Sequence, residues 1–418
     1  MSQYIIQGGN KLKGKVKLSG NKNSILPCLA ATLLTDKDVL IKNVPQIADV
    51  ELFLEILRSL GAEVEVFDHQ VRVNAGKANR RKLPDELSRK LRASILFVGP
   101  LLARLGKVEF PHPGGCVIGR RSIEAHLGGF SELGFKLRGK NGGYEASGFI
   151  SKKEEEVFLD EPSVTVTENL LLTAALGSSK VTLKNCAAEP HVVDLCRMLS
   201  MMGVGIEGVG TSTLKIRSSA NLKGGEFTIS SDYVEFGTYA IAAAITSGEI
   251  EIEGLPLKGM EPVVHPLEKM GLEFKEQGNA VGVTAKHIKP IQVLKTNIWP
   301  GFPTDMMSLA IVLATQARGV SLMHDWMYES RMFFTDKLIS MGANITIADP
   351  HRVLISGPAT LRRRELESPD IRAGMALVMA ALIAKGESII NRAELIERGY
   401  EDVVGKLSAL GAVIEKVS

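Results

Sequence analysis

The stretch PHPGGCVIGRR places a cysteine, Cys116, after two consecutive glycines and just before Arg120 and Arg121. Nearby cations stabilise a thiolate, and a Gly-Gly approach allows a loop to fold over a bound ligand and exclude water. A free cysteine is more often an inert small hydrophobe, which is what we expect of Cys28 and Cys196 in or beside apolar runs. The surroundings of Cys116 instead indicate a thiol that delivers a proton or attacks a substrate.

Cationic and amide side chains stand where apolar segments begin. Lys22 and Asn23 follow a glycine in SGNKNSILP, Arg92 opens RASILF, and SPDIRAGMA carries Asp370 and Arg372. If the apolar segments are helices, these side chains lie near helix N-termini, which favour phosphate and carboxylate groups. A lysine in such a place is nevertheless more often simply solvated.

Three further candidates are Asp305, Arg331 and Arg398. Asp305 precedes an apolar run in GFPTDMMSL, and an N-cap explains that spacing as well as chemistry does; on spacing alone we favour the cap. Arg331 in ESRMFF and Arg398 in ERGYED are predicted to open amphipathic helices. Single arginines there are usually on the surface, but their recurrence in register favours a shared cleft.

Six copies of one unit organise the chain. The phrase apolar-x-x-[Leu/Met]-Gly recurs at a spacing of about 70 residues. Its glycines are Gly61, Gly134, Gly203, Gly271, Gly342 and Gly411.

Each copy contains two kinds of helix. One is apolar nearly all round, as in GTYAIAAAI, and is therefore predicted to be buried on every side. The other ends in Leu-Gly and is predicted to be amphipathic, with a C-terminal glycine cap leading into a strand such as AEVEVF. A solenoid is the alternative, but solenoid repeats usually run about 20–50 residues. We therefore expect two domains of three units each, about 200 residues apiece.

Composition narrows the function classes. The 418 residues are 45% hydrophobic and 23% charged, and Lys+Arg (50) nearly balance Asp+Glu (47), so neither nucleic-acid binding nor disorder is indicated. We find no signal peptide and no apolar run long enough to span a membrane. The four cysteines have no zinc-ligand spacing. These observations predict a cytoplasmic chain with reduced thiols and neither a structural metal nor a disulfide framework.

Over its full length the chain resembles the UDP-N-acetylglucosamine 1-carboxyvinyltransferase family of enolpyruvyl transferases. The motifs are GNKNSILP, RASILFVGPLLARLG, PGGCVIGRR, FPTDMM, DIRAGMALVMAAL and RGYE, in family order. The resemblance implies a two-domain inside-out α/β barrel with the active site in the cleft between the domains. The first domain would comprise residues 22–229, and the second residues 1–21 with 230–418.

The resemblance also implies a reaction. Enolpyruvyl would pass from phosphoenolpyruvate to the 3′-hydroxyl of the acceptor sugar by addition and loss of phosphate, without metal or cofactor. Cys116 would protonate the methylene carbon and Asp305 would act as base. The cations would divide between the phosphate and the carboxylate of phosphoenolpyruvate: Lys22, Arg121 and Arg398 on the phosphate with Asn23 nearby, and Arg331 and Arg372 on the carboxylate. Lys22 is counted with the catalytic pair, and Asp370 supports the site.

The acceptor side follows from the same resemblance. The residues implied for the UDP-sugar are Asn23, Arg92, Arg121, Ser122, Ile123, Glu124, Ala125, Ser163, Val164, Thr165, Asp305 and Met327. The chain departs from the usual family pattern here, with Ser122 for Pro, Glu161 where some members carry Lys, Thr165 for Gly and Tyr233 for Arg. Arg120 stands where a small residue is usual.

Three functions remain open at this point: the family reaction, a paralogue that uses another nucleotide or nucleotide-sugar acceptor, and a catalytically silent sugar-nucleotide-binding homologue. A sister activity, 5-enolpyruvylshikimate-3-phosphate synthesis, shares the fold but lacks the cysteine loop. The expected partners are small molecules only, with no nucleic acid and no membrane, and the expected state is a monomer. The family resemblance further implies a role in peptidoglycan synthesis, hence in cell shape and division, and alkylation of Cys116 by fosfomycin.

Overall fold

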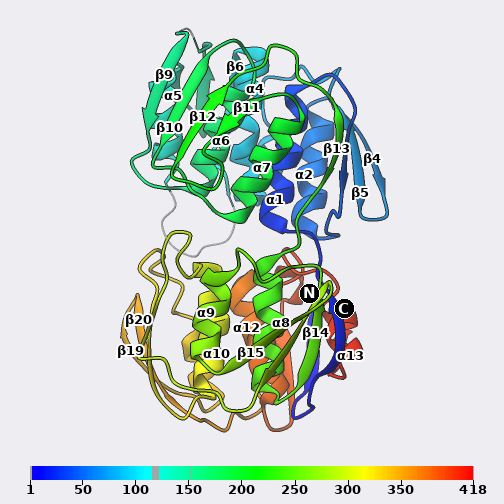
Figure 1. Cartoon of the computed structure of the whole chain (residues 1–418), viewed down its shortest axis with the longest axis vertical. Coiled ribbons are helices and arrows are strands. Elements are labelled where there is room, and N and C mark those ends of the chain that lie inside the picture. Colours follow the sequence, from blue (N-terminus) through cyan, green and yellow to red (C-terminus); the bar gives the residue numbers. More distant parts are fainter. Residues whose placement is uncertain (1, 115–121, 151, 418) are drawn as a thin grey trace. The chain divides into compact units, whose positions relative to one another are not determined.

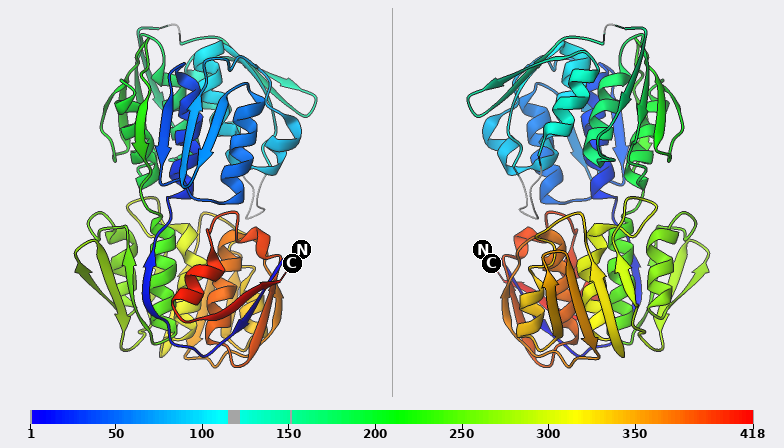
Figure 2. Two further views of the ribbon diagram at one scale, coloured as in Figure 1. Left: turned by 90° about the vertical axis from the view of Figure 1, so that its right-hand side faces the viewer. Right: turned by 90° about the vertical axis from the view of Figure 1, so that its left-hand side faces the viewer.

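The computed structural model of the chain describes residues 2–114, 122–150 and 152–417. Its contacts divide the chain into two compact units. Among the described residues, unit 1 contains 2–19 and 231–417, and unit 2 contains 20–114, 122–150 and 152–230. Each unit has its own hydrophobic core. Figures 1 and 2 show helices inside each unit and sheets around them.

The six apolar segments form buried helices, as predicted from their lack of a polar face. In unit 2 they are α1 (Lys22–Ala31), α4 (Val98–Leu105) and α6 (Val164–Ala175); in unit 1 they are α8 (Tyr233–Ile245), α10 (Met307–Thr315) and α12 (Ile371–Ile383). All thirteen residues of α8 are buried. Short 3-10 turns adjoin some of them: η1 (Thr32–Leu34), η2 (Arg92–Phe97) and η3 (Thr304–Met306).

The amphipathic helices end as their Leu-Gly signature predicts. They are α2 (Ala48–Ser59), α5 (Glu124–Glu132), α7 (Pro190–Met201), α9 (Glu261–Lys269), α11 (Thr335–Ser340) and α13 (Val403–Ala409). Each is followed by its repeat glycine with φ between 91° (Gly134) and 108° (Gly342). Only glycine adopts this left-handed conformation without strain. Two short helical segments lie outside the repeat pattern, α3 (Asp85–Lys90) and η4 (Ala393–Leu395).

Three sheets surround the helices of unit 2. Their strand orders are β13-β3-β5-β4, β6-β8-β7 and β11-β12-β10-β9. The strands are β3 (Val39–Lys42), β4 (Glu63–Phe67), β5 (Gln70–Asn74), β6 (Lys107–Pro111), β7 (Lys136–Lys140), β8 (Gly143–Ser147), β9 (Glu154–Phe158), β10 (Lys180–Lys184), β11 (Gly205–Glu207), β12 (Thr213–Arg217) and β13 (Gly225–Thr228). Because β13, from the end of the third repeat, pairs in parallel with β3 of the first, the unit closes on itself.

Unit 1 has three sheets of the same kind, ordered β15-β16-β14-β2, β17-β18-β20-β19 and β21-β22-β1-β23. The strands are β1 (Gln3–Gln7), β2 (Lys13–Lys17), β14 (Glu249–Glu253), β15 (Leu272–Gln277), β16 (Ala280–Ala285), β17 (Val293–Lys295), β18 (Gly319–His324), β19 (Asn344–Asp349), β20 (Arg352–Gly357), β21 (Glu365–Glu367), β22 (Glu387–Asn391) and β23 (Val413–Val417). The N-terminal strand β1 pairs with β22 and β23, and β2 pairs with β14. The first segment of the chain therefore completes the unit built from the last.

Two properties of the interior bear on function. Cys28 and Cys196 are fully buried, and burial raises the pKa of both thiols, that of Cys196 to about 12. They are the inert cysteines that the sequence predicts. Separately, none of the helices in the described parts of the chain is long and apolar enough to cross a membrane.

Candidate functional site

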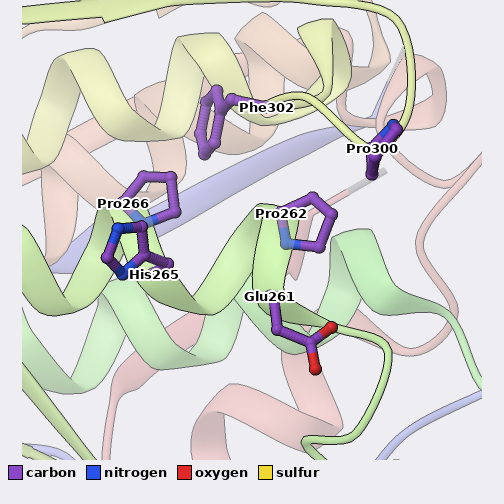
Figure 3. A pocket seen from close by; sticks show the side chains of 6 residues that line it. All are labelled: Glu261, Pro262, His265, Pro266, Pro300 and Phe302. Atoms are coloured by element: carbon purple, nitrogen blue, oxygen red, sulfur yellow. The ribbon is translucent and has the colours of Figure 1, made fainter.

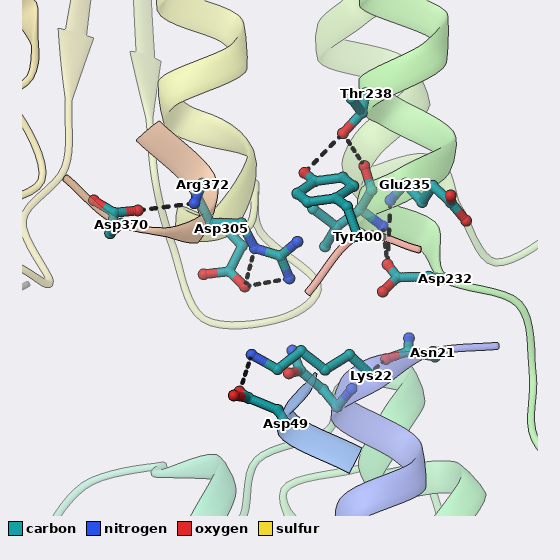
Figure 4. Close-up of polar contacts among 12 residues, drawn as sticks. Asn21, Lys22, Asp49, Asp232, Glu235, Thr238, Asp305, Asp370, Arg372 and Tyr400 are labelled. Carbon is teal, nitrogen blue, oxygen red and sulfur yellow. Dashed lines mark hydrogen bonds and ion pairs between the residues drawn. The ribbon is translucent and has the colours of Figure 1, made fainter. Parts of the chain in front are cut away.

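Asp305 lies between two buried arginines of unit 1. Its carboxylate oxygens accept from Nη2 of Arg331 at 3.2 Å and from Nη2 of Arg372 at 3.0 Å, and Nε of Arg372 also donates at 3.1 Å. Figure 4 shows the contact with Arg372. The guanidinium groups come from residues 26 and 67 positions further along the chain. The structure thus gathers three of the predicted residues into one charged cluster.

This arrangement corrects the N-cap interpretation of Asp305. The fifth apolar helix opens through the 3-10 turn η3, whose N-cap position is Pro303, and no side chain caps it. No side chain caps α10 either, and the Asp305 carboxylate bonds the two guanidiniums. Asp370, by contrast, does cap α12, accepting from the backbone N–H of Arg372 at 2.8 Å and of Ala373 at 2.9 Å. That cap fixes the turn from which the Arg372 side chain leaves the helix.

The two arginines are not surface residues. Arg331 is 3% exposed and Arg372 is 5% exposed. Burial is the largest single influence on the pKa of Arg372 and lowers it, but Asp305, Tyr400 and Asp232 together outweigh burial, and the net shift is upward. Within the described part of the chain, Nη1 of Arg372 is buried without a hydrogen-bond acceptor. A buried donor without an acceptor costs free energy, so this atom marks a place suited to an anion.

Neighbouring side chains hold the cluster in place. Asp325, fully buried, lies 3.9 Å from Nε of Arg331 and accepts from the backbone N–H of Met327 at 3.0 Å. The ring of Tyr400 lies under the Arg372 guanidinium, with 5.3 Å between Cζ and the ring centre. The sequence analysis does not find Asp325 or Tyr400, because neither occupies a position in the repeat that distinguishes it from an ordinary core residue. Met327 is partly buried beside the cluster.

The sequence predicts that Arg331 and Arg398 open amphipathic helices, and this prediction is wrong. Arg331 lies in the turn before α11, which begins at Thr335, and Arg398 lies between η4 and α13, which begins at Val403. In both places the guanidinium is carried by a loop that leads into the helix. Arg398 is partly buried and has a partner.

In unit 2, Lys22 is held by an acidic residue that sequence reasoning did not find. Lys22 is the first residue of α1, and its Nζ lies 2.9 Å from Oδ2 of Asp49 in the first turn of α2 (Figure 4). The side chains are 13% and 4% exposed, so the solvated-lysine interpretation is wrong. Asn21 caps α1 by accepting from the backbone N–H groups of Asn23 and Ser24. The cap sets where Lys22 and Asn23 leave the helix.

Several of the residues expected on the acceptor side lie in unit 2, whereas Asp305 and Met327 lie in unit 1. Nη2 of Arg92 donates to the backbone carbonyl of Ser122 at 2.8 Å, joining η2 to the segment that enters α5. His126, two residues beyond Glu124 at the start of α5, contacts Oγ1 of Thr165 in the first turn of α6 at 3.2 Å. Ile123 is buried, Ala125 is partly buried, and Ser163 and Val164 stand at the α6 N-terminus.

Cys116, Arg120 and Arg121 lie outside the described residues, so the acid and one phosphate contact stay predictions. A separate pocket of about 340 Å³ lies at the start of α9 (Figure 3). It is lined by Glu261, Pro262, His265, Pro266, Pro300 and Phe302. None of these is a predicted site residue.

The chain is similar to known proteins over nearly its whole length. Residues 6–407 match the family model for EPSP synthase (3-phosphoshikimate 1-carboxyvinyltransferase). The UDP-N-acetylglucosamine 1-carboxyvinyltransferase of Treponema denticola is 44% identical over 99% of both chains, and that of Borrelia garinii subsp. bavariensis is 41% identical over 100% of this chain and 99% of the relative.

Solved structures show the same fold. The enolpyruvyl transferase NikO from Streptomyces tendae superposes with a TM-score of 0.89 at 24% identity, covering 100% of this chain and 99% of that one. EPSP synthase from Acinetobacter baumannii gives 0.75 at 18% identity over the whole of both chains. The predicted two-domain inside-out α/β barrel is thereby confirmed. The chain belongs to the EPSP synthase family and, within it, to the UDP-N-acetylglucosamine 1-carboxyvinyltransferases.

Proposed function

We propose that this protein transfers the enolpyruvyl group of phosphoenolpyruvate to the 3′-hydroxyl of UDP-N-acetylglucosamine and releases inorganic phosphate. The observation that carries the proposal is the cluster in which Asp305 bridges two buried arginines while Nη1 of Arg372 lacks an acceptor. A substrate with a phosphate and a carboxylate needs several fixed cations. Donors already in place stabilise developing charge without reorganising.

In the addition step, Cys116 gives its proton to the methylene carbon of phosphoenolpyruvate, and Asp305 takes the proton of the sugar hydroxyl, whose oxygen bonds to the central carbon. In the elimination step, the methyl group gives a proton back to the Cys116 thiolate, the carbon–carbon double bond re-forms, and the bond from the central carbon to the phosphate oxygen breaks to release inorganic phosphate. Placing one acid and one base opposite reacting atoms contributes about 10²–10⁴-fold in rate.

The remaining residues bind and orient the substrates. Lys22, Arg121 and Arg398 take the phosphate, and Arg331 and Arg372 take the carboxylate. Support for Lys22 comes from its pairing with the buried Asp49, which fixes the ammonium group in position. The UDP-sugar is assigned to Asn23, Arg92, Arg121, Ser122–Ala125, Ser163–Thr165, Asp305 and Met327. Support comes from the contacts that join Arg92 to Ser122 and His126 to Thr165.

We further propose that the product supplies peptidoglycan synthesis, and so cell shape and division, in the cytoplasm, and that the enzyme acts as a monomer. Fosfomycin is expected to inactivate it by alkylating Cys116. Burial of the other thiols supports selective attack, because it raises the pKa of Cys186 to about 11 and that of Cys196 to about 12 and so leaves little thiolate there.

The test is phosphate release from phosphoenolpyruvate with a panel of acceptors, and mass spectrometry of the product. Release with UDP-N-acetylglucosamine, lost in Cys116→Ala and retained in part in Cys116→Asp, is expected. Cys186→Ala is the matched control and should turn over normally. Release only with another nucleotide sugar would replace the acceptor, and no release with any acceptor would favour a silent binding protein.

A further inference from the structure

The carboxylate of Asp325 is fully buried in unit 1 and has no part in the proposed reaction, yet it contacts the residues around the base. Asp325 directly follows β18. Its Oδ1 accepts from the backbone N–H of Met327 at 3.0 Å and from that of Tyr328 at 3.3 Å. Its Oδ2 accepts from the hydroxyl of Thr304 and lies 3.9 Å from Nε of Arg331. One buried anion therefore joins the turn before Asp305 to the segment that carries Arg331.

The position of Asp325 is fixed by the turn between β19 and β20. The backbone N–H of Asp325 donates to the carbonyl of His351 at 2.9 Å, and Nδ1 of His351 lies 2.7 Å from the carbonyl oxygen of Asp325. Because a carbonyl oxygen can only accept, Nδ1 of His351 is the donor. The backbone N–H of His351 donates in turn to the carboxylate of Asp349 at 2.8 Å. Asp325 is thus held by two bonds that do not involve its carboxylate.

Thr304 connects this anchored carboxylate to Asp305. Thr304 and Asp305 are the first two residues of the 3-10 turn η3, which no side chain caps. The Thr304 hydroxyl donates to Asp325, because an ionised carboxylate can only accept. Hydrogen bonds to a charged group are about twice as strong as those between neutral groups. The bond to Asp325 therefore takes the place of a cap and fixes the turn from which the Asp305 side chain leaves the backbone.

Arg331 lies between two carboxylates. Its Nη2 bonds Oδ1 of Asp305 at 3.2 Å, whereas its Nε, 3.9 Å from Oδ2 of Asp325, has no hydrogen-bond partner among the residues that the structure describes. Opposite charges at this distance attract without a bond. When Asp305 takes a proton from the sugar hydroxyl, Asp325 is the anion that still faces Arg331. The two carboxylates therefore share the neutralisation of one guanidinium.

We propose that Asp325 is a positioning residue for the transfer reaction: it orients the base Asp305 through the hydroxyl of Thr304, and its charge balances Arg331 after the base has been protonated. Asp325 is fully buried and does not itself touch substrate. The inference rests on the proposed function, because it takes Asp305 as the base and Arg331 as a cation that binds phosphoenolpyruvate. Its expected effect is on turnover, since a misplacement of about 1 Å in a reacting group can cost about 10²-fold in rate.

The test is a double-mutant cycle of Thr304→Val, Asp325→Asn and the double variant. Phosphate release from phosphoenolpyruvate gives kcat, and calorimetry gives the affinity for phosphoenolpyruvate. Each single substitution is expected to lower kcat by about tenfold to 10²-fold. The double variant is expected to be about as slow as Asp325→Asn alone, because both substitutions break the same hydrogen bond.

Affinity separates positioning from support of the fold. Thr304→Val should bind phosphoenolpyruvate within about twofold of the wild type. Asp325→Asn should bind it at least as tightly as the wild type, because it removes a negative charge that faces Arg331. A residue that only supports the fold would lose turnover and affinity together.

Two further variants complete the design. Thr304→Ser keeps the hydroxyl and should restore kcat to within about twofold of the wild type. Thr315→Val is the matched control, because it removes a hydroxyl that is buried at the other end of α10 and donates to the backbone carbonyl of Val312 at 2.7 Å. Its kcat should equal that of the wild type. If Asp325→Asn does not fold, the comparison of Thr304→Val with Thr304→Ser decides the question alone.

The outcomes separate the two proposals. If the wild type releases no phosphate with any acceptor, the proposed function fails, and this inference fails with it. If the wild type is active and Thr304→Val keeps the full kcat, the role of Asp325 in positioning the base is overturned. Strictly additive losses in the double variant would show that Thr304 and Asp325 act separately. Weaker binding of phosphoenolpyruvate in both single variants would show that the pair only supports the fold.

Discussion

Replacing Asp305 by asparagine should destabilise the protein measurably, because the carboxylate neutralises two buried guanidiniums. The bonds at 3.0 and 3.2 Å join it to arginine side chains that are 6% and 2% exposed. Removing one partner of a buried ion pair costs about 3–5 kcal/mol. Asp305 is itself 29% exposed, and Arg331 keeps Asp325 at 3.9 Å, so we expect the lower end, about 3 kcal/mol.

For a folding unit of about 200 residues, this loss lowers the Tm by about 6–12 °C. Differential scanning calorimetry in a buffer without phosphate measures it, and Asp336→Asn is the matched control. Asp336 lies in the first turn of α11 and is exposed, and its carboxylate accepts from the backbone N–H of Lys337. An unchanged Tm in Asp305→Asn would refute the inference that the carboxylate holds the arginines in place.

Three further predictions concern other parts of the molecule. Asp49→Asn should lower the free energy of unfolding in urea by about 3 kcal/mol, because it leaves the Lys22 charge buried without its partner. Adding Lys22→Met removes that charge and should recover part of the loss. Strictly additive effects of the two substitutions would contradict the pairing. Glu235 is buried, and burial raises its pKa from 4.5 to about 7. In the folded protein the Glu235 carboxyl therefore holds its proton more tightly than in the unfolded chain, and the free energy of unfolding falls by roughly 3 kcal/mol as pH rises from about 4.5 through 7. Glu235→Gln should flatten that part of the stability–pH curve. An unchanged slope would show that Glu235 does not cause the pH dependence. Gly99→Ala should cost about 1–3 kcal/mol in thermal unfolding, because its Cβ meets Asn169; full stability would show that the two helices can separate freely.

The sequence predicts the helices well because their causes are local. An apolar surface all round requires burial, and a left-handed cap requires glycine, so each repeat carries its own signals. The cap that spacing favours for Asp305 before α10 does not form, although Asp370, in a similar position before α12, does cap its helix. The difference lies in Arg331 and Arg372, which come from distant parts of the chain and bond the Asp305 carboxylate.

Residues that act through tertiary contacts leave no mark in spacing. His126 and Asn169 lie in ordinary helical sequence, 43 residues apart, and the hydrogen bond between them forms only because α5 and α6 pack side by side. Asp49 likewise has the pattern of an acidic residue at the start of a helix, and it does lie in the first turn of α2. Its contact with Lys22 depends on how α1 and α2 pack. The resemblance to a family predicts which residues are catalytic, and the structure adds the side chains that contact the described ones among them.

Asp305 has two tasks under the proposed function, and they oppose one another in a testable way. As an anion it neutralises Arg331 and Arg372; once it has accepted the proton of the sugar hydroxyl, both guanidiniums lose that neutralisation and attract the substrate's negative charge more strongly. Asp305→Asn resembles this protonated state. It should therefore bind phosphoenolpyruvate about tenfold more tightly than the wild type, by calorimetry, while its kcat falls by about 10²-fold or more. A variant that lost affinity and turnover together would show that the carboxylate only supports the fold, because removing a general base does not by itself weaken the binding of an anion.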